Sequence, residues 1–113
     1  MGIKIGLGKK REAMLRKELR RLLAGIKKLG AMKVILFGSL SESRVGKSSD
    51  IDLAIIKKTT KSFSERTEEL YKKLKPRVAV DFFVYTPEEI EKMKKTNYFI
   101  RRMLERGRVI YEA

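Results

Sequence analysis

The chain has 113 residues and carries 28 Lys and Arg against 14 Asp and Glu, which gives a formal net charge of +14. This length predicts a single domain, residues 1–113, with one core and no room for a separate substrate-binding domain. The absence of Cys and His excludes a disulfide framework, thiolate chemistry, imidazole catalysis and the usual zinc sites.

No apolar run approaches the roughly 20 residues that span a bilayer, and the first residues lack the apolar core of a signal peptide. We therefore expect a cytoplasmic protein without a membrane partner. The charged fraction is 37%, with no Trp, no Gln and Asn97 as the one Asn, a composition that resembles that of hyperthermophile proteins.

The first periodic segment runs from Lys10 to Leu29, and the glycines before it predict a loose N-terminus. Its apolar residues recur at spacings of three and four, which predicts an amphipathic helix ended by Gly30: Leu15, Leu19, Leu22, Ile26 and Leu29. The opposite face is basic. The simpler interpretation is a solvated surface over a core-facing leucine stripe, and the alternative is a surface that binds nucleic acid.

Three strands are predicted next. Residues 34–37 form an apolar run that ends in a Gly38-Ser39 turn, and residues 50–56 form a second strand. A period of two places Asp50 and Asp52 on one face of that second strand, with Ile51, Leu53 and Ile55 on the other. Residues 78–85 are apolar except for Asp81, as expected of a strand covered on both faces.

Helices fill the remaining segments. Ser62 and Glu65 form a capping box that opens a helix carrying Leu70, Tyr71 and Leu74 inward and ending before Pro76. A crossover of this length favours either parallel pairing of the strands it joins or a split arrangement. Thr86-Pro87 opens another helix, interrupted near Thr96-Asn97, and residues 98–106 form a last helix before an edge strand at 109–111. The predicted fold class is α/β, a small mixed sheet flanked by helices.

The aspartates are the chemically informative residues. If the strand with Asp81 pairs next to the others, three carboxylates approach each other, and two of them about 5 Å apart repel by roughly 3 kcal/mol at an effective dielectric of about 20. No Lys or Arg in these strands is an obvious partner, whereas oxygen ligands suit Mg²⁺ or Mn²⁺. Two such ions can stabilise an in-line phosphoryl or nucleotidyl transfer.

The Gly38-Ser39 turn supplies backbone N–H groups to a triphosphate, and Arg44 and Lys47 in the following loop are candidates for further contacts. Gly46-Lys47-Ser48 is not a P-loop, because Ser41 stands where that motif needs Gly. Each signal is ordinary when it stands alone: a strand-end Asp can bond local backbone or water. Together, in this order, they favour a metal-dependent site.

Gly38-Ser39, ten residues, Asp50-Ile51-Asp52 and then an isolated Asp81 resemble the nucleotidyltransferase superfamily with a DNA polymerase beta type palm, in its minimal stand-alone branch. The resemblance implies that fold and ATP as the donor. It also implies that Asp50, Asp52 and Asp81 hold two Mg²⁺ ions, that Asp81 accepts the proton of the incoming hydroxyl, and that Gly38 and Ser39 hold the β and γ phosphates. Relatives often carry Ala-Arg-Gly where this chain has Ser41-Glu42-Ser43.

Such minimal proteins resemble the antitoxins of paired modules, whose small helical HEPN-type toxin is silenced by AMP placed on a tyrosine. A partner of that kind is therefore expected, and a homo-oligomer is compatible with the sequence. Two alternatives stay open: transfer to nucleic acid or a small hydroxylated molecule, and a non-catalytic basic module that binds nucleic acid or a toxin.

Overall fold

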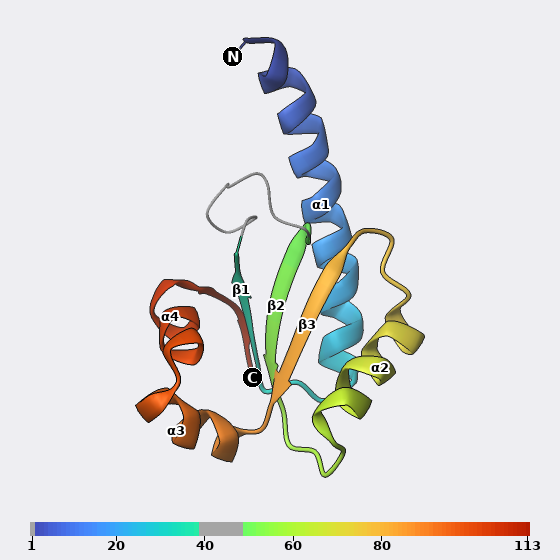
Figure 1. The fold of residues 1–113 in the computed structure, drawn as a ribbon. Coiled ribbons are helices and arrows are strands. Elements are labelled where there is room, and N and C mark those ends of the chain that lie inside the picture. Colours follow the sequence, from blue (N-terminus) through green and yellow to red (C-terminus); the bar gives the residue numbers. More distant parts are fainter. Residues whose placement is uncertain (1, 39–48) are drawn as a thin grey trace.

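The computed structural model of the protein describes residues 2–38 and 49–113, with side chains from Gly8 onward. In these residues a mixed sheet lies between two pairs of helices (Figure 1). The elements follow the predicted order: α1 (Gly2–Lys28), β1 (Lys33–Phe37), β2 (Ile51–Ile56), α2 (Phe63–Leu74), β3 (Val80–Tyr85), α3 (Pro87–Thr96), α4 (Tyr98–Arg106) and β4 (Arg108–Glu112).

The strand order in the sheet is β3-β2-β1-β4. β1 pairs antiparallel with both β2 and β4, whereas β2 and β3 are parallel. The parallel pair is joined through α2, which is one of the two arrangements that the length of that crossover favoured. β3 is consequently an edge strand, and β4 occupies the other edge as expected.

The two faces of the sheet have separate cores. The face under α1 and α2 buries the leucine stripe of α1 together with Ile51, Leu53 and Ile55, which confirms the predicted alternation in β2. The face under α3 and α4 carries the alternate residues of the strands and is packed by Ile100 and Met103 of α4. The apolar side of α1 therefore packs in the core. This assignment does not depend on what the basic side of the helix binds.

The helix starts follow the predicted caps. The Ser62 hydroxyl accepts from the Glu65 N–H and the Glu65 carboxylate accepts from the Ser62 N–H, and Thr86 and Glu89 repeat this box at α3. Asn97 separates α3 from α4 and caps the latter. No helix among the described residues is long and apolar enough to cross a membrane.

The N-terminus differs from the prediction, because α1 begins at Gly2 and not near Lys10. A helix that has already nucleated gains one hydrogen bond for each residue added, which offsets the cost of about 1 kcal/mol for an isolated glycine. The added turns project beyond the sheet, past the end where β1 finishes and β2 and β3 begin (Figure 1).

Three side chains are less buried than predicted. β3 is not covered on both faces, since Asp81 is exposed and Phe83 only half-buried. The helices α3 and α4 pack on one face of the sheet, around Tyr85 and Ala54. They leave the row that contains Asp81, at the start of β3, open. Tyr71 was expected inside the core, but it lies at the sheet edge with 42% of its surface exposed.

Candidate active site

One row of side chains crosses the open part of the sheet. Asp52 on β2 is the register partner of Asp81 on the parallel strand β3 and of Phe37 on the antiparallel strand β1. Register partners on neighbouring strands point to the same face, about 4.8 Å apart. Hydrogen bonding of the main chain therefore brings these two of the three predicted carboxylates together.

Asp52 is held firmly by its surroundings. Its side chain is only 5% exposed, and Oδ1 accepts a hydrogen bond of 2.6 Å from the Ser49 hydroxyl. Ser49 was not singled out from the sequence, although its position three residues before Asp52 suits a local side-chain contact. The buried carboxylate thus has a fixed orientation at the end of β1.

Gly38 makes room for that carboxylate. A Cβ atom at this position would lie 2.0 Å from Oδ2 of Asp52, and the backbone has a φ of +80°, which L side chains rarely adopt. Asp52 therefore leaves no room for a side chain at position 38, so the residue predicted to form the phosphate turn has to be glycine. Ser39, Arg44 and Lys47, the other residues expected to contact the phosphates, lie outside the described residues.

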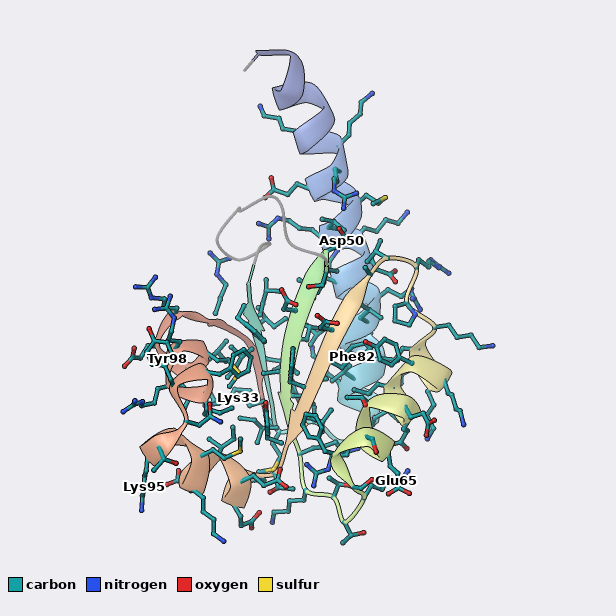
Figure 2. All side chains as sticks on the ribbon, in the orientation of Figure 1. Lys33, Asp50, Glu65, Phe82, Lys95 and Tyr98 are labelled. Carbon is teal, nitrogen blue, oxygen red and sulfur yellow. The ribbon has the colours of Figure 1, made fainter. Side chains whose placement is uncertain are left out.

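Asp50 has other neighbours. It precedes β2, and its Oδ2 accepts a hydrogen bond of 3.3 Å from the Ala79 N–H, while Oδ1 accepts from the Arg11 guanidinium of α1. Figure 2 shows Asp50 at the beginning of β2, next to α1. The strand sequences predicted no cation near the acids, because the cation that pairs with Asp50 comes from a helix residue 39 positions earlier in the chain.

The described residues contain no group of three or more acidic side chains placed to hold a metal ion. What they contain is the Asp52–Asp81 pair, whose four oxygens are hard ligands of the kind that Mg²⁺ and Mn²⁺ prefer. Asp81 is exposed and Asp52 is fixed. The pair suits a divalent cation shared with phosphate oxygens, and Asp50 can join it only by leaving Arg11.

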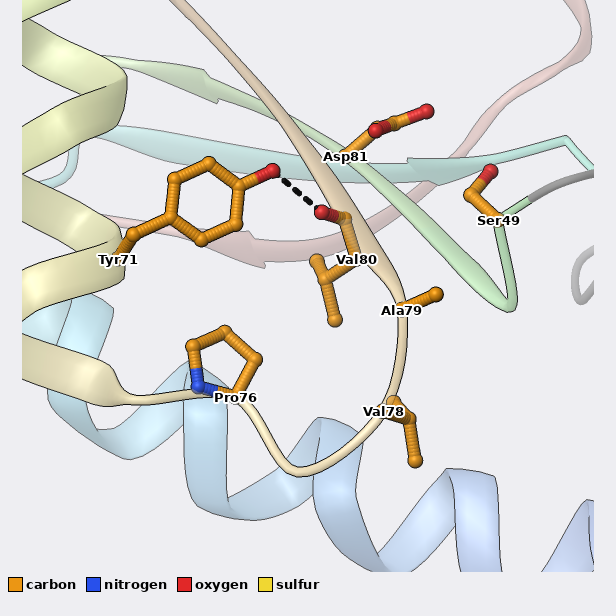
Figure 3. Close-up of a pocket in the computed structure, with 7 residues that line it drawn as sticks. All are labelled: Ser49, Tyr71, Pro76, Val78, Ala79, Val80 and Asp81. Carbon is orange, nitrogen blue, oxygen red and sulfur yellow. Dashed lines mark hydrogen bonds between the residues drawn. The ribbon is translucent and has the colours of Figure 1, made fainter.

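A hollow of about 260 Å³ adjoins Asp81 at the free edge of β3, lined also by Ser49, Tyr71 and Pro76 (Figure 3). The Tyr71 hydroxyl donates to the carbonyl of Val80 on this edge strand. Burial, and secondly the charge of Asp81, raise the pKa of the Tyr71 hydroxyl. The phenol therefore stays neutral at physiological pH.

A mixed sheet that sets two carboxylates side by side next to a glycine turn defines the nucleotidyltransferase class of domain. The sequence itself leads to the same class: the model of the family described as "Polymerase beta, Nucleotidyltransferase" matches residues 18–113. The chain belongs to that family, in agreement with the resemblance seen in its motifs.

The chain is also similar in structure to a candidate nucleotidyltransferase from Sulfolobus solfataricus, known from a crystal structure. The similarity has a TM-score of 0.65 and covers 93% of this chain and 86% of the other, at 16% sequence identity. At this identity the similarity shows the shared fold. No curated protein matches the chain by sequence.

Proposed function

We propose that the protein transfers AMP from ATP to an acceptor hydroxyl in a reaction that depends on Mg²⁺, or on Mn²⁺ in its place. The observation that carries this proposal is the Asp52–Asp81 pair on one face of β2 and β3, directly beside the Gly38 turn. Membership of the family supports a nucleoside triphosphate as donor, and the choice of ATP rests on the resemblance to minimal nucleotidyltransferases.

The transfer is a displacement at phosphorus. The acceptor oxygen forms a bond to the α-phosphorus, the bond from that phosphorus to the bridging oxygen breaks, and pyrophosphate leaves. Asp81, which is exposed and on the outermost strand, accepts the proton of the acceptor hydroxyl. Divalent cations held by Asp52, Asp81 and Asp50 would neutralise the charge that develops on the phosphate oxygens.

The acceptor we propose is a tyrosine on a small helical HEPN-type toxin, which makes this protein the antitoxin of a pair. Asp81 lies on an edge strand and not at the bottom of a cleft. A hydroxyl on the surface of another folded protein can therefore reach it. The pairing with a HEPN protein comes from the resemblance of the sequence.

Nucleic acid is the second candidate acceptor, and the polar side of α1 is the observation that favours it. Arg16 and Arg21 form ion pairs with acids of the same helix. Lys27 lies over the Tyr111 ring. The other described cations of that side are exposed, so phosphates can reach them: Lys9, Lys10, Lys17, Arg20 and Lys28.

The experiment is a transfer assay with ATP labelled at the α-phosphate, Mg²⁺, and in separate tubes a helical HEPN-type protein, RNA and an aminoglycoside. We expect label on a tyrosine of the protein acceptor, lost in Asp81→Asn and retained in Glu68→Gln, which removes an exposed carboxylate from α2. Label on RNA or on the aminoglycoside alone would replace the proposed acceptor. An Asp81→Asn variant as active as the wild type would refute the proposed catalytic site.

A further inference from the structure

Three aromatic rings from three different elements meet next to the Asp52–Asp81 pair. Phe37 of β1, Phe83 of β3 and Phe99 of α4 form a triangle in which the ring centroids are 5.5 to 5.7 Å apart. These separations lie in the range of favourable aromatic contacts. We call Phe37, Phe83 and Phe99 the aromatic triangle.

The strand register places the aromatic triangle beside the acids. Phe37 is the register partner of Asp52, so it stands in the same row as the acidic pair. Phe83 follows Asp81 by two residues on the same face of β3 and is the register partner of Ala54 on β2. The small Ala54 side chain leaves the space above β2 to the rings, one row away from the carboxylates.

Core packing does not account for Phe99. Ile100 and Met103, the residues by which α4 packs on the sheet, are 0% and 3% exposed, whereas Phe99 keeps 44% of its surface exposed. Phe37 and Phe83 are half-buried. Exposed aromatic residues occur elsewhere on the molecule, but Phe99 contacts two rings that flank the acidic pair, and its exposed part is accessible to a ligand bound there.

The chemistry of the proposed function indicates which ligand. With the triphosphate at the Gly38 turn and the α-phosphate at the two carboxylates, the ribose and the base extend from that point over the neighbouring surface. The aromatic triangle is an apolar surface next to the acidic pair, on the same face of the sheet as both carboxylates. Three rings are also far smaller than the roughly 1,000 Å² of total surface that a specific protein interface buries.

We propose that the aromatic triangle is the stacking surface for the base of the donor nucleotide, with Phe99 as the ring that contacts it. This inference rests on the proposed function and adds the place of the base to it. The rings offer π faces and no hydrogen-bonding group, so stacking tolerates different bases. ATP and GTP should therefore bind within a few fold of each other.

The absence of Trp from the chain makes a direct test possible. Phe99→Trp introduces a single indole at the stacking surface, and we expect its fluorescence to be quenched when Mg-ATP binds. Phe63→Trp is the matched control, because Phe63 is a similarly exposed aromatic residue, at 47%, that packs on Tyr85 at the other end of β3. Its fluorescence should not change.

Calorimetry with two ligands separates the base from the phosphates. In Phe99→Ala we expect ATP to bind about 5-fold to 100-fold more weakly, while inorganic tripolyphosphate binds as it does to the wild type. Phe99→Tyr keeps a stacking ring and should retain ATP affinity. Thermal unfolding of each variant by circular dichroism verifies that the fold is retained.

The outcomes distinguish the two proposals. If the wild type binds ATP but Phe99→Ala binds it equally well, the stacking surface is refuted and the nucleotidyltransferase site remains. If the wild type binds neither ATP nor tripolyphosphate, the proposed function fails and the inference fails with it. If Phe99→Ala loses a helical partner protein but keeps ATP, the aromatic triangle is a protein contact and the inference is wrong.

Discussion

Asp52 excludes any residue larger than Gly38 at the end of β1, because a Cβ atom on residue 38 would lie 2.0 Å from Oδ2 of Asp52. The glycine and the acid are 14 residues apart in the sequence, yet each determines what the other position can hold. The turn that is expected to receive phosphate and the carboxylate that is expected to receive metal thus form one structural unit.

Gly38→Ala should damage both stability and transfer. A left-handed backbone costs an L residue about 1–2 kcal/mol, and relief of the contact with Asp52 adds about 1 kcal/mol or more. Gly30→Ala is the matched control, since Gly30 also has a positive φ of +94° but would place its Cβ in open space. Urea unfolding and the labelled transfer assay measure the two effects; equal losses in both variants would show that the contact with Asp52 is unimportant.

Arg11→Ala should strengthen the binding of divalent cations. The Arg11 guanidinium contacts the Asp50 carboxylate, so a cation that uses Asp50 must displace it. Both side chains are partly exposed, and an exposed ion pair contributes about 1 kcal/mol or less, which limits the gain in Mn²⁺ affinity to about fivefold. Arg16→Ala, which breaks an ion pair with Glu12 on the same helix, should leave the Mn²⁺ affinity measured by calorimetry unchanged.

Arg66 joins the two helices that lie on opposite faces of the sheet. Its buried guanidinium donates to the Glu89 carboxylate of α3 at 2.8 Å and to the carbonyls of Val84 and Lys61. Arg66→Met removes all these donors at once and should lower the free energy of unfolding by about 2–3 kcal/mol. The transfer activity of the folded variant should be unaffected, because the contact lies at the far end of β3.

The same contact makes stability depend on acid pH. Hydrogen bonds from Arg66 are the main cause that lowers the pKa of the Glu89 carboxyl from 4.5. A carboxyl group whose pKa is lower in the folded state than in the unfolded state makes its full contribution to stability above the unfolded-state pKa. That contribution is lost as the pH falls through the folded-state pKa. The difference in Tm between the wild type and Glu89→Gln should therefore shrink as the pH falls from 4.5 through the folded-state pKa of Glu89. At still lower pH the difference should disappear. A constant difference would contradict this linkage.

Tyr71→Phe should test the hydrogen bond that the Tyr71 hydroxyl makes at the free edge of β3. The variant loses the hydrogen bond to the Val80 carbonyl and should be less stable by about 1 kcal/mol. Burial raises the pKa of Tyr71 above 10.0, so its contribution is complete below pH about 10 and is lost as the pH rises through the folded value. Tyr98→Phe, which removes a hydroxyl from an exposed position, should change the free energy of unfolding less than Tyr71→Phe does.

Local patterns in the sequence predicted most of the fold. The capping boxes at Ser62 and Thr86 fix where α2 and α3 begin, and the alternation in β2 fixes which residues enter each core. The length of the crossover favoured parallel pairing of β2 and β3 or a split arrangement, and the structure has the parallel pairing. These features depend on residues close together in the chain, where spacing and propensity suffice.

The site was predicted less completely, because its missing parts come from distant segments. The period of two places Asp50 and Asp52 on one face, but it carries no information about the helix that supplies Arg11. Nor does it show that Phe99 of α4 reaches Phe37. Tyr71 was assigned to the core from its helical spacing, whereas the edge position of β3 gives its hydroxyl a role that only the strand order reveals.

The interval between Asp52 and Asp81 is set by the main-chain ladder of β2 and β3. The pitch of a sheet hardly varies with side-chain identity, so substitutions throughout the core can accumulate while these two carboxylates keep their separation. The chain shares its fold with the Sulfolobus protein at 16% identity, so the pairing of strands that sets this interval does not require a particular set of neighbouring side chains.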